Sequence, residues 1–402
     1  MMKGSAVRLD DLVQRVSKWD PRRSSDDKAF PYIDLSSVDK ELKAIVPLNV
    51  PLVEPADAPS RARQLVQKDD VLVSTVRPNL NGVARVDSEF DGATASTGYC
   101  VLRPDPERLD SKYLFYWVQT PTFIQKMVGE ATGANYPAVS DRIIKASELP
   151  LPALSEQKRI ATILDKADAL RRKRQQAIEL ADQFLRSMFL EMFGDPVSNP
   201  KGWSEAPLST GIARIESGWS AKGDNRPAGE GQIGVLKISS VTSGKFIPSE
   251  NKVVDESTVP AGKKLLKPRA GDLLFSRANT RDLVAATAIV DRDYDNLFLP
   301  DKLWKIQTNE QLLPEFLNYL LWQQRMRDRL RSQATGTSGS MLNISKKKFE
   351  ETSAIFPPIE QQRKFVELYR KAIAISEKYS SASDLTEELF DSASQKAFSS
   401  QL

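Results

Sequence analysis

The chain lacks histidine altogether and contains a single cysteine, Cys100. Without histidine, the Ser-His-Asp and Cys-His nucleophile systems, histidine general bases and most catalytic zinc sites are excluded. One cysteine cannot form an intrachain disulfide, so we expect a reducing, cytoplasmic compartment. An enzyme of this size would have to work with carboxylates or lysine.

Long apolar runs are also missing. No stretch approaches the roughly 18 apolar residues of a membrane span, and the first residues, MMKGSAVRLDDLV, lack the apolar core of a signal peptide. The formal net charge is only +4, an excess that fits nucleic acid but also many other partners. We therefore expect no membrane association, and we look for local clusters of positive charge.

Catalytic motifs are equally scarce. GKF at 244–246 lacks the upstream glycine of a phosphate-binding loop, and no glycine-rich dinucleotide fingerprint follows a strand. FPPI at 356–359 has the wrong first and last residues for the [DN]-P-P-[YF] motif of an amino-methyltransferase. We predict no catalytic, cofactor-binding or metal-binding residues in this chain. A cryptic nuclease or methyltransferase site, built from scattered Asp, Glu and Lys, stays open as an alternative.

What the sequence does contain is a faint internal repeat. Six stretches of the first half reappear in the same order in the second half, at an offset near two hundred residues. The pairs are VRLDDLVQRVSKW (7–19) with APLSTGIARIESGW (206–219), YIDLSSV (32–38) with VLKISSV (235–241), DVLVST (70–75) with DLLFSR (272–277), KYLFYW (112–117) with EFLNYL (315–320), ATGANYPAVS (131–140) with ATGTSGSMLNIS (334–345), and LPALSEQKRI (151–160) with FPPIEQQRKF (356–365). The order predicts a duplicated unit; the alternative is two unrelated domains that share common turn sequences.

Each half mixes two kinds of pattern. Short apolar runs such as 70–76 and 272–275 indicate buried strands, whereas 112–130 and 315–333 have apolar residues at helical spacing. We therefore predict two similar mixed α/β units in a chain of the α+β class.

Two long helices are expected after these units. From Ser155 to Phe193 there is no Gly or Pro, and apolar residues recur in steps of three and four. A second helix is expected from Pro358, although SSASD (380–384) weakens its middle. The predicted apolar positions are Ile160, Leu164, Ala167, Ile178, Ala181, Leu185, Met188 and Met192 in the first helix, and Phe365, Tyr369, Ile373, Leu389, Ala393 and Phe398 in the second.

An exposed apolar stripe on a long helix needs a partner. We predict that the two helices pair as an antiparallel coiled coil, which would relate the two units by a pseudo-two-fold axis. The alternative is that each helix packs on its own unit. Two similar units held apart suit a DNA sequence in two parts, with one part for each unit.

Two groups of polar residues are candidates for DNA contact, because Arg and Asn read bases while Lys and small polar residues contact the phosphate backbone. The first group surrounds the repeated strand and comprises Arg77, Asn79 and Asn81 in the first half and Lys263, Lys264, Lys267, Arg277, Asn279 and Arg281 in the second. The second group lies in the Thr-Gly loops and comprises Thr132, Asn135, Tyr136, Thr335, Thr337, Ser338, Ser340, Lys346 and Lys347. Ordinary polar turns and solvent loops are the alternative.

The basic run RRKR at 171–174 is a third candidate. Acidic residues flank it on the same predicted helix, among them Asp168 and Glu179. A solvated helix face is therefore favoured over a nucleic-acid patch. Because the run lies in the middle of the helix, a protein partner is the other possibility.

At this point the chain resembles the specificity subunit of type I restriction-modification systems. The resemblance is carried by the doubled helix starts LPLPALSEQKRIATIL and IFPPIEQQRKFVEL, by the junction LRSMFLEMFGDPVSNPKGW (185–203), and by the order unit, helix, unit, helix. It spans essentially the whole chain. In this family the two units are expected to diverge because they encode the target, so individual base contacts are not carried over.

The resemblance implies two target-recognition domains, 1–154 and 194–357, a central spacer helix at 155–193 and a distal one at 358–402. It also implies a non-catalytic subunit that reads a bipartite, interrupted site in double-stranded DNA. The expected partners are methyltransferase subunits, two in number, and a restriction and translocase subunit. S-adenosylmethionine, ATP and Mg are expected in those partners. A two-headed scaffold that binds only proteins remains the third alternative.

Overall fold

The structure, a computed structural model, describes residues 6–24, 28–336 and 341–398, with the backbone alone for 380–397. The chain forms two compact units. Unit 1 comprises residues 1–177 and 378–402, and unit 2 comprises residues 178–377. Among the described residues, no helix combines the length and the apolar character that crossing a bilayer requires.

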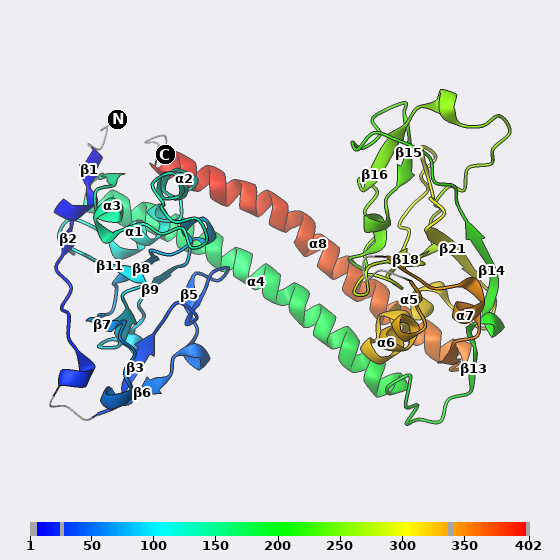
Figure 1. The fold of residues 1–402 in the computed structure, drawn as a ribbon, viewed down its shortest axis with the longest axis horizontal. Helices are drawn as coiled ribbons and strands as arrows, with labels where there is room; N and C mark the ends of the chain where they lie inside the picture. Colours follow the sequence, from blue (N-terminus) through cyan, green and yellow to red (C-terminus); the bar gives the residue numbers. More distant parts are fainter. Residues whose placement is uncertain (1–5, 25–27, 337–340, 399–402) are drawn as a thin grey trace. The chain divides into compact units, whose positions relative to one another are not determined.

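Unit 1 contains two four-stranded sheets (Figure 1). The first is antiparallel throughout and has the order β2 (Val13–Gln14), β11 (Tyr99–Pro104), β8 (Val71–Ser74), β9 (Val83–Arg85). The second has the order β6 (Leu52–Val53), β3 (Phe30–Ile33), β10 (Thr94–Ser96), β7 (Ala62–Leu65), and its β3–β10 pair is parallel. Two strand pairs complete the unit: β1 (Ala6–Arg8) with β12 (Glu148–Pro150), and β4 (Val38–Asp39) with β5 (Ala44–Ile45).

Unit 2 repeats this topology. Its antiparallel sheet has the order β14 (Ile212–Ser217), β21 (Leu303–Thr308), β17 (Leu273–Ser276), β19 (Thr287–Ile289). Its second sheet has the order β16 (Asn251–Val254), β15 (Ile233–Leu236), β20 (Leu297–Phe298), and β15–β20 is again parallel. The remaining pairs are β13 (Glu205–Pro207) with β23 (Ser353–Ile355), and β18 (Ala278–Asn279) with β22 (Leu342–Asn343). The matching order of strands confirms the duplication predicted from the sequence.

Three short helices follow the sheets in each unit. They are α1 (Ser111–Trp117), α2 (Pro121–Gly129) and α3 (Asp141–Lys145) in unit 1, and α5 (Pro314–Trp322), α6 (Gln324–Ser332) and α7 (Lys346–Glu350) in unit 2. The caps repeat as well, because Ser140 accepts a hydrogen bond from the Ile143 amide and Ser345 accepts one from the Lys348 amide.

A buried ion pair braces the antiparallel sheet of each unit. In unit 1 the guanidinium of Arg103 contacts both carboxylate oxygens of Asp70, at 2.9 and 2.8 Å. Burial raises the pKa of Asp70, and the hydrogen bonds from Arg103 oppose that shift. In unit 2 the corresponding aspartate, Asp272, pairs with Lys305, which lies at a different position of the neighbouring strand from Arg103. The repeat DVLVST/DLLFSR therefore preserves a strand together with the acidic partner of this pair.

Two helices are much longer than the rest: α4 (Leu154–Phe193) and α8 (Ile359–Phe398). Unit 1 holds the start of α4 and the end of α8, and unit 2 holds the end of α4 and the start of α8. The two helices therefore run in opposite directions, and the predicted α+β class with two long antiparallel helices is confirmed. α8 continues as one helix through 380–384, the segment that the sequence marked as weak.

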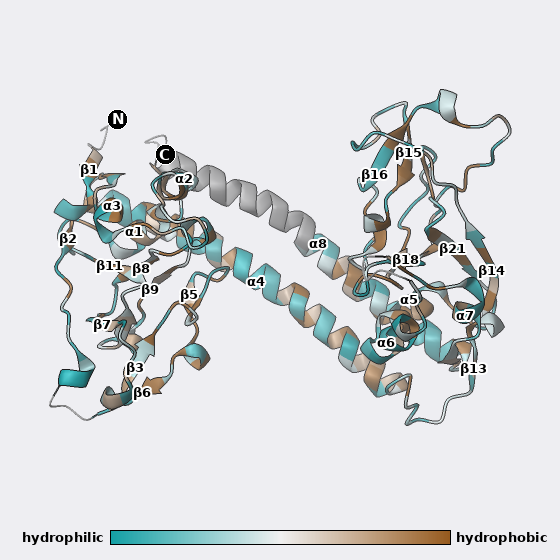
Figure 2. Cartoon of the chain, in the orientation of Figure 1, coloured by the Kyte–Doolittle hydropathy of each residue, from teal (hydrophilic) through white to brown (hydrophobic). Residues whose placement is uncertain are grey.

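The ends of the long helices enter the cores of the units through aromatic side chains. Phe193 lies 5.0 Å from Phe316 and 5.7 Å from Phe365 (ring centroids), all within unit 2. In unit 1, Phe398 lies 5.0 Å from Tyr113. The predicted seam of α4 is buried at Ile160, Leu164 and Leu185 but omits the fully buried Phe189 and Phe193. Figure 2 shows the resulting alternation of apolar and polar residues along α4.

A buried glutamine fixes the start of each long helix. Gln157 is fully buried; its amide nitrogen donates to the carbonyls of Arg108 and Pro152, both at 2.9 Å, and its oxygen accepts from the Asp110 amide at 2.9 Å. Gln362 is also fully buried and makes the same three contacts, to the carbonyls of Gln311 and Pro357 and from the amide of Leu313. The repeated glutamine of SEQKR and EQQRK thus ties each long helix to the loop that precedes α1 or α5.

Replacing either glutamine with leucine should destabilise its unit by about 2–4 kcal/mol, because buried backbone groups would lose their partners. The measurement is urea unfolding of Gln157→Leu and Gln362→Leu, followed by fluorescence. Gln176→Leu, an exposed position on α4, is the matched control and should change stability by less than about 0.5 kcal/mol. Equal urea midpoints of unfolding for all three variants would contradict a structural role for the two buried glutamines.

Candidate nucleic-acid interface

The two polar loops predicted in unit 1 lie side by side. Val76 forms a bridge with Ala138, and the Arg77 amide donates to the Pro137 carbonyl at 2.7 Å. The guanidinium carbon of Arg77 lies 4.8 Å from the ring centroid of Tyr136, and that ring is 69% exposed. The structure thus joins Arg77 and Tyr136 into one exposed cation–π pair. Asn79, Thr132 and Asn135 are exposed around it.

The first loop of unit 1 is held in an unusual backbone conformation. Arg77 and Asn81, which flank a 3-10 turn at Pro78–Leu80, both have positive φ, 50° and 44°. The carbonyl of Asn81 accepts a hydrogen bond from the Lys43 amine at 2.7 Å. The pKa of Lys43 is lowered to about 8, first by burial and then by repulsion from Arg171, while Asp39 acts in the opposite direction.

Unit 2 brings its two loops together by a strand pair. β18 pairs with β22, so Asn279 lies opposite Leu342, and Thr335 bridges to Asn343. Asn279 is half-buried and its side-chain oxygen accepts from the Thr280 amide at 2.8 Å, whereas Arg281 and Thr335 are exposed. The predicted residues Thr337, Ser338 and Ser340 lie outside the described residues.

Arg277 is engaged within the unit. Its Nε donates to the Asp301 carbonyl at 2.9 Å, one Nη contacts the Asp301 carboxylate at 3.2 Å, and the other contacts the Asn343 side-chain oxygen at 3.4 Å. The residue at the equivalent place in unit 1 is Thr75, which is buried and donates to the Gly98 carbonyl. Arg277 therefore braces the two loops, and base contact by it stays a prediction.

The predicted lysines of unit 2 are spread over two places. Lys263 and Lys264 are exposed, and the Lys263 amine lies 5.7 Å from the Trp219 ring centroid. Lys267 is half-buried, 3.9 Å from Asp295. Lys346 and Lys347 begin α7, where Lys346 donates to the Ile215 carbonyl at 3.2 Å and Lys347 lies 3.8 Å from Glu351. Lys346 belongs with the loop pair because α7 follows β22 directly.

The basic run on α4 is not a bare positive patch. Arg171 and Arg172 both contact the carboxylate of Asp168, at 2.7 and 2.6 Å, and Arg172 also donates to the Leu42 carbonyl at 2.6 Å. Asp168 is one of the flanking acids noted in the sequence. The run thus helps to attach the β4–β5 hairpin to α4.

Three cations that touch the loops were absent from the sequence prediction: Lys43 in unit 1, and Arg327 and Arg331 in unit 2. Arg327 and Arg331 both donate to the carbonyl of Asp282. The basic composition of QRMRDRLRS at 324–332 was a visible signal. Lys43 gave none, because it lies 38 residues from Asn81 in the chain.

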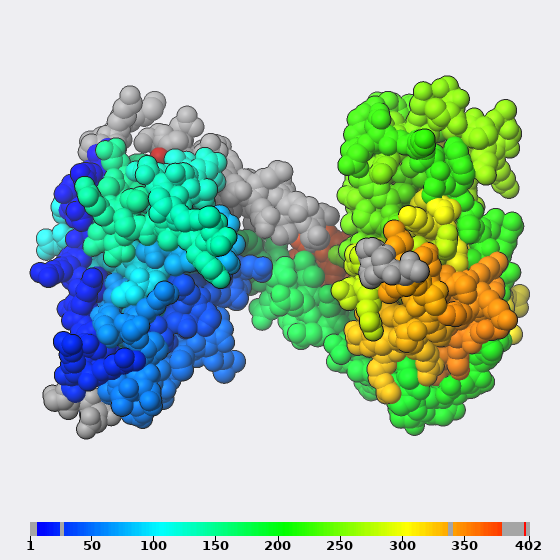
Figure 3. All heavy atoms as spheres, viewed as in Figure 1, coloured from blue at the N-terminus to red at the C-terminus, as the bar shows by residue number. Residues whose placement is uncertain are grey.

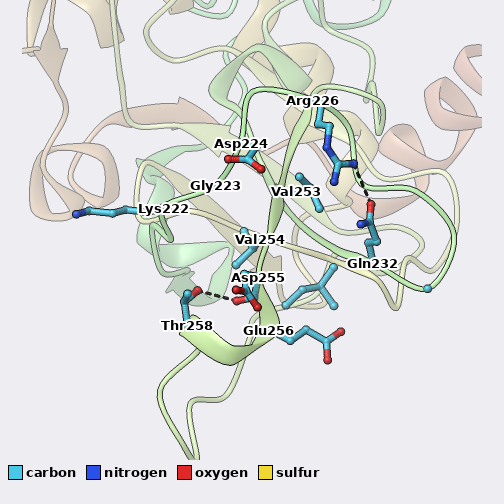
Figure 4. A pocket seen from close by; sticks show the side chains of 12 residues that line it. Lys222, Gly223, Asp224, Arg226, Gln232, Val253, Val254, Asp255, Glu256 and Thr258 are labelled. Atoms are coloured by element: carbon cyan, nitrogen blue, oxygen red, sulfur yellow. Dashed lines mark hydrogen bonds between the residues drawn. The ribbon is translucent and has the colours of Figure 1, made fainter.

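A cavity of about 570 Å³ lies elsewhere in unit 2, beside β15 and β16 (Figure 4). Its charged lining residues are Lys222, Asp224, Arg226, Asp255 and Glu256. Arg226 donates to the Gln232 side chain at 3.0 Å. The mixture of signs gives the cavity little preference for phosphate, so the loop pairs are the better interface. Within the described residues, no cluster of His, Cys, Asp or Glu has the arrangement of a metal site.

Comparison with known proteins gives these loops a context. Residues 60–180 match the family described as the type I restriction modification DNA specificity domain. The chain is 22% identical over 359 residues to the type I restriction enzyme EcoKI specificity subunit of Escherichia coli K12, which covers 84% of this chain and 76% of that one. It is 25% identical over 173 residues to the Escherichia coli EcoEI specificity subunit, covering 42% of this chain and 29% of that one.

Solved structures share the fold. A type I restriction-modification S subunit from M. genitalium matches with a TM-score of 0.62 at 14% identity, covering 98% of this chain and 96% of that one. A chain from a structure of type I restriction-modification complex assembly matches with a TM-score of 0.55 at 22% identity, covering 99% and 98%. Residues 60–180 thus carry the match to this family, the chain is similar in sequence to type I restriction enzyme specificity subunits, and it shares its fold with the solved S subunit.

Proposed function

We propose that the chain selects a bipartite, interrupted sequence in double-stranded DNA, and that each unit reads one half through its loop pair. The observation that supports this most directly is the repetition of the loop pair at the same place of two topologically equivalent units. A loop with exposed Arg and Asn after the antiparallel sheet can reach base edges, while neighbouring Lys and Thr contact the phosphate backbone. In unit 1 these are Arg77, Asn79, Thr132, Asn135 and Tyr136.

The two units differ in what they offer to DNA. Unit 1 presents the Tyr136 ring with the Arg77 guanidinium over it. Unit 2 presents Asn279, Arg281 and Thr335, and its Lys263, Lys264 and Lys346 would contact the phosphate backbone of DNA. Different side chains on one frame suit two different half-sites. An asymmetric target follows from this difference.

The long helices are proposed to dock the partner subunits. α4 carries exposed apolar side chains at Ile163, Leu170, Leu180, Phe184 and Leu190, between 37% and 55% exposed. Exposed apolar residues in such number mark a protein-binding surface. We assign these exposed side chains to the docking of methyltransferase subunits, two in number, which are joined by a restriction and translocase subunit. S-adenosylmethionine, ATP and Mg would then be bound by those partners, and this chain would supply selection without catalysis.

One prediction of this proposal concerns the methylated sequence itself. Co-expression of this chain with a methyltransferase subunit with which it assembles should place methyladenine in a split motif, as measured by single-molecule sequencing of host DNA. Deletion of the chain should abolish the motif. Methylation that is unchanged by the deletion, together with a complex that does not form, would favour the alternatives that this chain is a protein-only scaffold or has a cryptic active site of its own.

A second prediction concerns spacing. Insertion of four residues after Ala177 in α4 and after Glu377 in α8 adds about one helical turn, roughly 6 Å, to each helix at the point where the two units divide. The gap between the half-sites should change while both half-sites stay the same. Substitution of four exposed residues at the same places, without insertion, is the control. An unchanged gap would contradict a spacer role for the helices.

A further inference from the structure

The loop that follows the antiparallel strand is anchored at the same backbone position in both units. We call residues 77–81 and 279–285 the recognition turns. Each ends in a left-handed residue, Asn81 with φ 44° and Ala285 with φ 65°. The next residue then returns to the sheet, because Gly82 accepts from the Ser74 amide and Ala286 accepts from the Ser276 amide, both at 2.8 Å. Each turn also has an internal hydrogen bond, from the Leu80 amide to the Arg77 carbonyl in unit 1 and from the Leu283 amide to the Thr280 carbonyl in unit 2. A cation from outside each turn adds a further contact.

In unit 1 a lysine from outside the turn holds it. Lys43 lies at the tip of the β4–β5 hairpin in a left-handed conformation, φ 52°, and its amine donates to the Asn81 carbonyl at 2.7 Å. The same hairpin tip is tied to α4, because the Leu42 carbonyl accepts from Arg172 at 2.6 Å. A continuous path of hydrogen bonds thus runs from the long helix to the recognition turn.

In unit 2 two arginines hold the recognition turn, and they follow it in the sequence, whereas Lys43 precedes its turn. Arg327 and Arg331, one turn apart on α6, both donate to the carbonyl of Asp282, the first at 3.1 Å. Arg327 is itself held by Trp322, whose ring centroid is 4.1 Å from the guanidinium carbon. Trp322 in turn donates to the Thr287 carbonyl at 2.9 Å, in the strand that follows the turn. In Figure 3, α6 belongs to the orange part of unit 2 that faces the viewer.

The arginine pair is costly to maintain, which argues that its position matters. The Nε atoms of both side chains are buried and have no hydrogen-bond partner among the described residues. The pKa of Arg327 is lowered to about 10, mainly by burial and then by repulsion from Arg331, with Asp282 and Asp328 partly compensating. α2, which precedes the Thr-Gly loop of unit 1 as α6 does in unit 2, carries no arginine.

We propose that Lys43 and the Arg327–Arg331 pair are specificity-determining positioning residues. Each clamps the recognition turn of its own unit through one backbone carbonyl, and each thereby sets which bases that turn reads. The clamps act without contact to DNA. Base reading demands side chains placed within about 0.5 Å, so loss of a clamp spreads the turn over several positions. This inference rests on the proposed function, because it requires that the turns face DNA.

The decisive feature of the proposal is that the two clamps act on separate half-sites. The assembled complex with the methyltransferase is used for the test, with methyladenine sequencing and binding to the wild-type target duplex. Lys43→Met should relax base selection about 5- to 100-fold in one half-site and leave the other unchanged, the range expected when one bidentate base contact is lost. The double variant Arg327→Met with Arg331→Met should do the reverse.

Conservative and neighbouring variants separate positioning from mere stability. Lys43→Arg keeps a donor and should restore selection, whereas Arg327→Lys keeps the charge but loses the planar stack and should restore only part of it. If the double variant fails to assemble, Arg327→Lys alone carries the test of the unit 2 clamp. Lys40→Met, on the same hairpin, and Arg325→Met, on the same helix and paired with Asp195 at 3.1 Å, are the matched controls and should leave the motif intact.

Three outcomes would overturn the proposal that these cations act as clamps. One is wild-type selection at both half-sites in the clamp variants. Another is equal loss at both half-sites together with a shallower salt dependence of binding, which assigns these cations to phosphate contact. The third is loss of selection that follows thermal stability across all variants. A wild-type complex without any split motif would instead defeat the proposed function, so the two failures are distinguishable.

Discussion

The fold depends on a glutamine amide that is removed from water at the start of each long helix. An amide has two donors and an accepting oxygen, and leaving these unpaired in a buried place is costly. Gln157 and Gln362 each meet two carbonyls and one amide, and those groups belong to the loop before α1 or α5 and to the proline that precedes the helix. One side chain therefore fixes both where a unit ends and the direction in which its helix leaves.

The two units share the sheets and short helices around this glutamine, but they differ in the contacts that hold their surface loops. The sheet order, the buried ion pair and the serine caps recur in both units. The contacts that hold the recognition turns do not recur: a lysine from a hairpin serves in unit 1 and two arginines from a helix serve in unit 2. Packing constrains the frame, because any change in volume is felt by many neighbours. The exposed residues of the turns, such as Asn79 and Arg281, escape that constraint.

The sequence predicted this division well where the signal was local. The order of the repeats predicted the duplicated topology. The absence of Gly and Pro from Ser155 to Phe193 predicted the start of α4 to within one residue of its observed start at Leu154. Side-chain roles were harder to predict, because they depend on partners distant in the chain. The contacts of Arg277 with Asp301 and Asn343 were not anticipated, and DNA contact by Arg277 stays a prediction. Asn343 is 66 residues away, and no pattern in the sequence links the two.

The equivalence of the two joints has a consequence for how new variants of this protein can arise. Phe193, at the end of α4, lies 5.0 Å from Phe316 in unit 2, and Phe398, at the end of α8, lies 5.0 Å from Tyr113 in unit 1 (ring centroids). Each unit thus provides an aromatic residue, here called its socket, against which the last residue of a long helix packs. A unit that keeps its socket, its glutamine tie and its loop before α1 or α5 meets the same mechanical requirements on either side of the chain. Under the proposed function, genetic exchange of one unit between relatives would alter one half-site at a time, because the contacts at the joint stay the same.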